Sequence, residues 1–250
     1  MADNSTKTGP DLIPEILYED NHILVVIKPP GLLSQADSSG HADIFSVLKD
    51  YIKQSRNKPG NVYLGLLHRL DRSTGGIMVF ALTSKAAARL SEEIRKSRLI
   101  KKYLALLPFS EDQVRKSLGE SEGELVDIYR KDEASRMAIA CKPNEPGARE
   151  ARLRYRLRPD LSPSKHSVLE IDLITGRFHQ IRFQLSSRGL PLCGEARYAN
   201  QGLPDFRLGL WAFHLEFDHP VGTDKRRMIF ERMPSEEWWK VRLQSPPPGN

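Results

Sequence analysis

Two polar segments contain the residues whose types and spacing could do chemistry. The first is His68-Arg69-Leu70-Asp71-Arg72-Ser73-Thr74-Gly75-Gly76, which lies between two apolar runs. Adjacent cations favour an ionised carboxylate, so Asp71, with Arg69 and Arg72 beside it, is a candidate nucleophile or acceptor that stays charged at neutral pH. The structural alternative is that Asp71 caps a turn and the Gly-Gly pair supplies positive φ.

The second polar segment is Thr175-Gly176-Arg177-Phe178-His179-Gln180-Ile181-Arg182. Its Thr-Gly turn leads into an expected helix, on which residues three and four positions apart are neighbours. Arg177 and Arg182 could therefore hold phosphates or pair with Asp71. The same spacing also fits a helix with ordinary exposed arginines.

Four segments together resemble one known family. His68–Gly76 resembles the HRLDRxTSG signature of the RluA-type pseudouridine synthases, and Val25–Gly31 resembles their strand-KPxG element. Lys102–Ala105 resembles their KxYxA element, and Thr175–Arg182 resembles their TGRxHQIR element. The four elements occur in the family's order across roughly residues 16–220, which chance matching does not explain.

The resemblance implies an isomerase that converts uridine to pseudouridine in structured RNA, either rRNA or tRNA, without cofactor or metal. Asp71 aligns with the catalytic aspartate, which attacks the target nucleoside at C1′ or acts through a glycal route. Tyr103 aligns with the tyrosine that packs on the target base and is a candidate to take the C5 proton. Arg182 aligns best with the arginine that pairs with the aspartate, and Arg177 is the alternative.

Several cations beside these residues are expected to contact the RNA. Arg69 is a candidate to fill the gap left by an extruded nucleotide or to hold its phosphate. The other expected RNA-binding residues are Lys28, Arg72 and Arg177. His68 and His179 are expected to belong to the scaffold, because the family's reaction needs no imidazole acid.

The chain departs from the family pattern at three places. Thr74-Gly75-Gly76 stands where Thr-Ser-Gly is usual, Cys193–Ala199 places Glu195 in a GDxxYG element, and Leu210-Trp211-Ala212 stands where Leu-His-Ala is usual. These changes bear on substrate details rather than on the reaction. We expect no S4-type RNA-binding domain before Ile16, so target choice would lie in the catalytic domain.

Two functions from other classes remain open. One is a catalytically inactive RNA-binding or ribosome-assembly protein of the same fold, against which the joint presence of Asp71, Tyr103 and Arg182 argues. The other is a nucleosidase or glycosidase, but most of those enzymes use paired carboxylates, and the catalytic loop offers one carboxylate among cations.

Composition supports a polyanionic partner without proving one. The 250 residues carry a net charge of +6, and the basic excess falls in residues 61–110 and 151–200. Those two blocks would line one positive cleft if they fold against each other. The alternative is solvated faces, favoured locally by Arg152–Arg158, where alternation places four arginines on one strand face. Cys141 and Cys193 are expected to be buried free thiols, since their spacing fits no zinc or redox pair.

The elements that must position these residues indicate an α+β fold with a mixed, largely antiparallel sheet, flanking helices and a central catalytic cleft. Helices are expected after Asp43 as N-cap, from Ser84 to Ser97 with Ala87, Leu90 and Ile94 on the apolar face, from Phe178 to Arg188, and from Ser235. Strands are expected at 23–27, 76–82, 103–107, 124–129, 137–141, 151–157, 168–175, 211–217 and 228–231.

We expect one catalytic domain over residues 15–243 between a flexible segment, 1–14, and a flexible Pro-rich tail, 244–250. The polar N-terminus does not resemble a signal peptide, and no apolar run is long enough to span a membrane. These features favour a cytoplasmic protein, and without a long exposed apolar helix face we expect a monomer.

Overall fold

The chain forms two compact units in its computed structural model, which describes residues 13–57, 59–163, 165–199, 208–222 and 226–235. The first unit comprises residues 1–99 and 215–232, and the second comprises 100–214 and 233–250. Each combines helices with antiparallel strands, which confirms the α+β class. The expected flexible ends, apart from Ile13 and Pro14, and the helix expected from Ser235 fall outside the described residues. The single domain over 15–243 stays a prediction.

The first unit is built on two completely buried strands. The apolar run of β2 (Ile23–Lys28) pairs antiparallel with the equally buried β4 (Gly75–Ala81), as their lack of polar alternation predicts. Three short strands complete the pairing. They are β1 (Ile16–Glu19) on β2, β3 (Gly65–Leu66) on β4, and β11 (Arg227–Glu231) on β10 (Leu210–Asp218), the strand whose residues are shared by both units.

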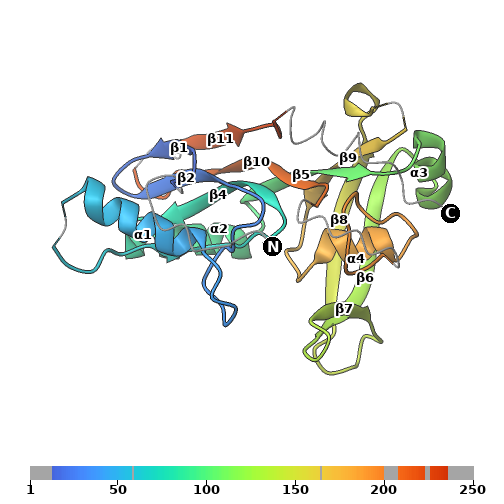
Figure 1. The fold of residues 1–250 in the computed structure, drawn as a ribbon, viewed down its shortest axis with the longest axis horizontal. Helices are drawn as coiled ribbons and strands as arrows, with labels where there is room; N and C mark the ends of the chain where they lie inside the picture. Colours follow the sequence, from blue (N-terminus) through green and yellow to red (C-terminus); the bar gives the residue numbers. More distant parts are fainter. Residues whose placement is uncertain (1–12, 58, 164, 200–207, 223–225, 236–250) are drawn as a thin grey trace, which may run out of the picture. The chain divides into compact units, whose positions relative to one another are not determined.

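Two amphipathic helices belong to this unit. Helix α1 (Ile44–Ser55) begins where expected, because the side chain of Asp43 accepts a hydrogen bond from the Ser46 amide at 2.9 Å. Helix α2 (Ser84–Arg95) has Thr83 as its N-cap and packs on β3 and β4 (Figure 1). Leu90 is buried as predicted, but the second buried residue of α2 is Ala86 rather than Ala87.

The second unit is a wide antiparallel sheet with the strand order β5-β9-β8-β6-β7. Its strands match the expected segments within a few residues: β5 (Ile100–Leu107), β6 (Glu122–Asp132), β7 (Met137–Ala140), β8 (Arg149–Leu157) and β9 (Ser167–Leu173). A 3-10 turn, η2 (Pro159–Leu161), precedes β9. Neither cysteine forms a disulfide, and Cys193 is buried as predicted, whereas Cys141 is only half-buried.

Two helices of the second unit correct the sequence reading. Helix α3 (Glu111–Leu118) was not predicted, although Ser110 and Gln113 form a capping box at its start. Helix α4 was expected over 178–188 but spans only Gln180–Ser186, because His179 adopts a left-handed conformation with φ 50°. Phe178 therefore lies outside the helix. The α4 side chain of Gln184 donates to the carbonyls of Leu125 and Ala151, which ties α4 to β6 and β8 (Figure 1).

The four arginines that alternate along β8 and its end form a charge-compensated face. Each one pairs with carboxylates: Arg152 with Glu124 and Glu150, Arg154 with Glu124, Arg156 with Glu122, and Arg158 with Asp160 and Glu170. The cross-strand partners on β6 and β9 come from the antiparallel register. This favours the solvated-face reading and leaves little positive charge here for a phosphate backbone.

Candidate functional site

The loop that carries Asp71 is fastened to the turn after β2 through the backbone and side chain of Arg72. Gly31 and Arg72 exchange two hydrogen bonds: the Gly31 amide donates to the Arg72 carbonyl at 2.7 Å, and Arg72 Nε donates to the Gly31 carbonyl at 3.0 Å. The Thr74 amide donates to the Asp71 carbonyl at 3.0 Å, which closes a turn over residues 71–74. Half-buried Asp71 thus lies on a doubly fixed loop.

Lys28 is the residue that most alters the sequence interpretation. Its side chain is completely buried, and Nζ donates to the carbonyls of Leu32 at 2.7 Å, Pro29 at 3.0 Å and Arg72 at 3.2 Å. Burial lowers the pKa of Lys28 to about 7, while Asp71 raises it and Arg72 lowers it. A side chain without solvent access does not bind RNA, so the expected RNA contact is corrected to a role in positioning the loop.

The flanks of the loop are equally constrained. The Ser34 hydroxyl donates to the Leu70 carbonyl at 2.7 Å and accepts from the Leu70 amide at 3.0 Å. His68 Nε2 accepts a hydrogen bond from the Val79 amide at 3.2 Å, in keeping with the expected scaffold role. Of the two glycines after Thr74, Gly76 has a positive φ of 127°, which only glycine adopts without strain.

Arg182 and Glu195 form a buried ion pair in the second unit. Arg182 Nε and Nη2 donate to the two Glu195 oxygens at 2.8 and 2.6 Å, and Glu195 also accepts from the Arg197 amide at 2.9 Å. Burial alone would raise the pKa of Glu195, but the Arg182 hydrogen bonds and charge hold it below its ordinary value. The acidic position noted in Cys193–Ala199 thus fixes the guanidinium.

The turn before α4 is held by one glutamine. Gln180 Oε1 accepts from the Thr175 hydroxyl at 2.8 Å and from the Arg177 amide at 3.0 Å. Arg177 is exposed, and its Nε donates to the Glu150 carbonyl at 3.0 Å. Within the described part of the chain it has no carboxylate partner, so its charge remains uncompensated.

Tyr103 and two lysines sit on successive residues of β5. Tyr103 is buried and pairs with Ile171 of β9. Lys102 points to the opposite face and donates to Glu170 at 3.2 Å. Lys101 lies on the same face of the strand as Tyr103 and has no ion pair among the described residues. Its Nζ lies close to Gly176, since a Cβ atom added to that glycine would be 3.6 Å away. Burial lowers the pKa of Lys101 below its ordinary value.

The predicted site residues are divided between the two units. Lys28, Arg69, Asp71 and Arg72 belong to the first unit, where Arg69 is exposed, and Tyr103, Arg177 and Arg182 belong to the second. Sequence reasoning missed Lys101 as a candidate, although strand alternation from Tyr103 indicates its face. It also treated Glu195 only as a departure from the family pattern, not as the partner of Arg182.

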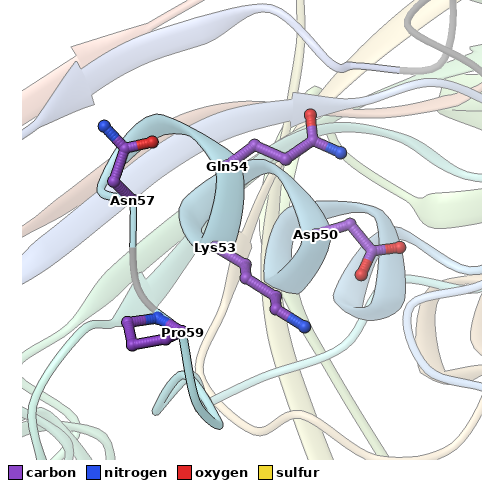
Figure 2. A pocket seen from close by; sticks show the side chains of 5 residues that line it. All are labelled: Asp50, Lys53, Gln54, Asn57 and Pro59. Atoms are coloured by element: carbon purple, nitrogen blue, oxygen red, sulfur yellow. The ribbon is translucent and has the colours of Figure 1, made fainter.

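A surface hollow also lies in the first unit. A pocket of about 500 Å³ at the end of α1 is lined by Asp50, Lys53, Gln54, Asn57 and Pro59 (Figure 2). None of the predicted site residues lines it.

Across the described segments, no three His, Cys, Asp or Glu side chains gather as metal ligands, and no helix is long and apolar enough to cross a membrane.

Comparison with known proteins gives a consistent result. The RNA pseudouridylate synthase family profile matches residues 22–187. Ribosomal large subunit pseudouridine synthase D of Xanthomonas campestris is 30% identical over 242 residues, with 91% of this chain and 69% of that protein covered. The uncharacterized RNA pseudouridine synthase YhcT of Bacillus subtilis is 29% identical over 230 residues, covering 90% of this chain and 72% of that protein.

The solved structures agree on the fold. Human RNA pseudouridylate synthase domain containing 4 superposes with a TM-score of 0.69 at 23% identity, covering 94% of this chain and 95% of that one. Human RNA pseudouridylate synthase domain containing 1 superposes with a TM-score of 0.64 at 21% identity, covering 98% of this chain and 100% of that one. With the motifs of both units and a family match over more than half its length, the chain belongs to the RluA-type RNA pseudouridine synthases, which are isomerases.

Proposed function

We propose that this protein isomerises specific uridines in rRNA or tRNA to pseudouridine, with Asp71 as the catalytic nucleophile. The observation that carries the proposal is the fixed Asp71 loop, in which Gly31 and Arg72 exchange two hydrogen bonds within a family-matched segment. A carboxylate that must meet one anomeric carbon benefits from such rigidity, because small misplacements cost large factors in rate.

In the reaction the glycosidic N1–C1′ bond breaks, the uracil turns, and a C5–C1′ bond forms. The C5 proton is lost and N1 is protonated, so the product is an isomer and no cofactor is consumed. Asp71 either attacks C1′ to form a covalent intermediate or assists a glycal route. Both routes need an ionised carboxylate close to the sugar.

Tyr103 and Arg182 take the supporting roles in this proposal. The Tyr103 ring packs on the extruded base, and its hydroxyl is the candidate acceptor of the C5 proton. Arg182 pairs with the Asp71 carboxylate. A guanidinium carries five N–H donors, so the two bonds to Glu195 are compatible with a second carboxylate. Arg177, whose Nε holds the Glu150 carbonyl, is assigned to RNA phosphate instead.

The RNA is expected to be structured and to be held through its backbone by exposed cations, with Arg69 and Arg177 contributing. The relatives named as ribosomal large subunit pseudouridine synthases support an RNA substrate of this class. We further propose that the protein acts in the cytoplasm as a monomer, which size-exclusion chromatography with light scattering would test.

The deciding experiment compares the wild type with Asp71→Asn on total unmodified RNA, and maps new pseudouridines by chemical labelling and sequencing. Asp71→Asn keeps the shape of the side chain but removes the charge. Asp50→Asn, at an exposed aspartate of α1 in the same unit, is the matched control. We expect new sites with the wild type and the control, and none with Asp71→Asn.

The other outcomes separate the alternatives. If the wild type binds RNA and forms no pseudouridine, the inactive RNA-binding reading replaces the proposal. If free uracil is released, the protein is a nucleosidase. Activity retained by Asp71→Asn would remove the nucleophile assignment. Tyr103→Phe then tests the proton acceptor: we expect RNA affinity to persist while turnover falls roughly 100-fold, within the usual range for loss of a general base.

A further inference from the structure

An aromatic ring stands exposed on the turn that leads into α4. The side chain of Phe178 is 36% exposed, whereas the neighbouring aromatic residues Tyr129 and Phe183 are buried. Its ring stacks on His179 with centroids 3.8 Å apart and planes at 20°. One face of the Phe178 ring is therefore covered by His179, and the ring does not belong to the apolar core.

Two tyrosine hydroxyls fix the turn that carries this ring. The Tyr129 hydroxyl donates to the Phe178 carbonyl at 3.0 Å, and Nδ1 of His179 lies 2.9 Å from the Tyr198 hydroxyl. His179 adopts φ 50°, a conformation that costs a residue with a side chain on the order of 1 kcal/mol. Side-chain hydrogen bonds thus fix this strained turn while the Phe178 ring stays exposed. Such an arrangement indicates a preformed binding surface.

One lysine lies over the ring, and two further cations lie along the turn that leads to it. Arg177 precedes it with a charge that no described carboxylate compensates, and Lys101 Nζ lies beside Gly176 on the same turn. Lys131 Nζ lies over the ring itself, 5.5 Å from the Phe178 centroid, and is also paired with Glu133, so a stacked base would displace this exposed side chain. Aromatic rings interleaved with cations are typical of surfaces that stack unpaired bases and hold the adjoining phosphates.

We propose that Phe178 is a stacking platform for an unpaired base of the bound RNA, with Arg177 holding an adjacent phosphate. The inference rests on the proposed function only in taking RNA as the ligand. Phe178 occupies the variable position of the TGRxHQIR element, so the platform adjusts target recognition in this chain and leaves the isomerisation chemistry to other residues.

Binding of two labelled strands tests the platform by fluorescence anisotropy. One is a 12-nucleotide oligouridylate, and the other is an abasic ribose-phosphate strand of the same length. We expect the wild type to bind oligouridylate about tenfold more tightly than the abasic strand. Phe178→Leu should reduce that difference to the part contributed by Tyr103, without weakening abasic binding, and Phe178→Tyr should keep it. Arg177→Gln should weaken both.

Tyr63→Leu, which removes an exposed aromatic ring from the first unit, is the matched control and should leave both affinities unchanged. Equal wild-type affinity for the two strands, or an unchanged preference in Phe178→Leu, would overturn the proposal and favour a protein ligand for this surface. The readout is distinct from catalysis: loss of pseudouridine formation with intact base-dependent binding would refute the proposed function and leave the platform standing.

Discussion

Replacing Lys28 by Met tests whether a buried ammonium positions the catalytic loop. The wild-type Nζ serves the carbonyls of Leu32, Pro29 and Arg72, and Met fills similar volume without any donor. At pH 9 the folded wild-type amine is neutral and donates two N–H bonds. Leaving their acceptors unpaired costs roughly 1 kcal/mol each, so we expect Lys28→Met to be about 2 kcal/mol less stable.

The stability difference between the wild type and Lys28→Met should become smaller at lower pH. The folded-state pKa of Lys28 is about 7 and its ordinary value is 10.5, so between these pH values the unfolded chain binds more protons. The free energy of unfolding of the wild type therefore rises with pH across this window. From pH 7 to pH 9 the rise is about 2 kcal/mol. Methionine does not titrate, so the stability of Lys28→Met should lack this rise. The variant should therefore nearly match the stability of the wild type at pH 7.

Urea unfolding followed by circular dichroism at pH 7, 8 and 9 measures the difference between the two proteins. Lys53→Met, at an exposed lysine of α1, is the control and should show no pH-dependent difference. A deficit of Lys28→Met that stays constant or shrinks toward pH 9 would refute the reasoning. Reduced turnover of Lys28→Met at pH 7, where its stability is nearly normal, would further assign Lys28 to positioning the Asp71 loop.

Three further predictions concern the second unit. Arg182→Met leaves buried Glu195 without its bidentate partner, and we expect a loss of about 3–5 kcal/mol in urea unfolding; a loss below about 1 kcal/mol would contradict a buried pair. Lys101→Met should lower the salt dependence of RNA affinity by about one phosphate contact, measured by anisotropy across a salt series, and Lys102→Met should change it less. Arg156→Gln should alter stability by at most about 0.5 kcal/mol and leave RNA affinity unchanged, since its ion pair is exposed; a clear fall in affinity would restore this face as an RNA surface.

Local patterns made much of the fold predictable. The apolar runs at 23–27 and 76–82 became buried strands, and Asp43 capped α1, because each signal depends on nearby residues. The end of α4 was predicted two residues late, at Arg188, because the positive-φ glycine, Gly189, follows two residues after the actual C-cap, Ser187. Its start was not predictable in this way, because His179 adopts a left-handed conformation in which its ring contacts Tyr198, nineteen residues away.

The candidate site was predictable as a set of residues but not as a set of contacts. Motif positions selected Asp71, Tyr103 and Arg182, yet nothing local distinguishes a buried Lys28 from a surface lysine at a strand end. Its three acceptors include the Arg72 carbonyl, 44 positions away. The Arg182–Glu195 pair likewise joins α4 to a later loop. The sequence motif suggested only that Arg182 pairs with Asp71, and it gave no sign of the buried partner Glu195.

Charge counts left a positive cleft and solvated faces as alternatives for the same reason. The 151–200 block holds nine basic residues, of which six form ion pairs with carboxylates within the second unit: Arg152, Arg154, Arg156, Arg158, Arg182 and Arg188. Apart from the buried Arg182–Glu195 pair, such exposed pairs contribute little stability, but they compensate charge that would otherwise attract phosphate. Arg177 lies outside these pairs, beside an exposed ring. The RNA footprint of this unit should therefore follow uncompensated cations near aromatic groups, not the density of basic residues in the sequence.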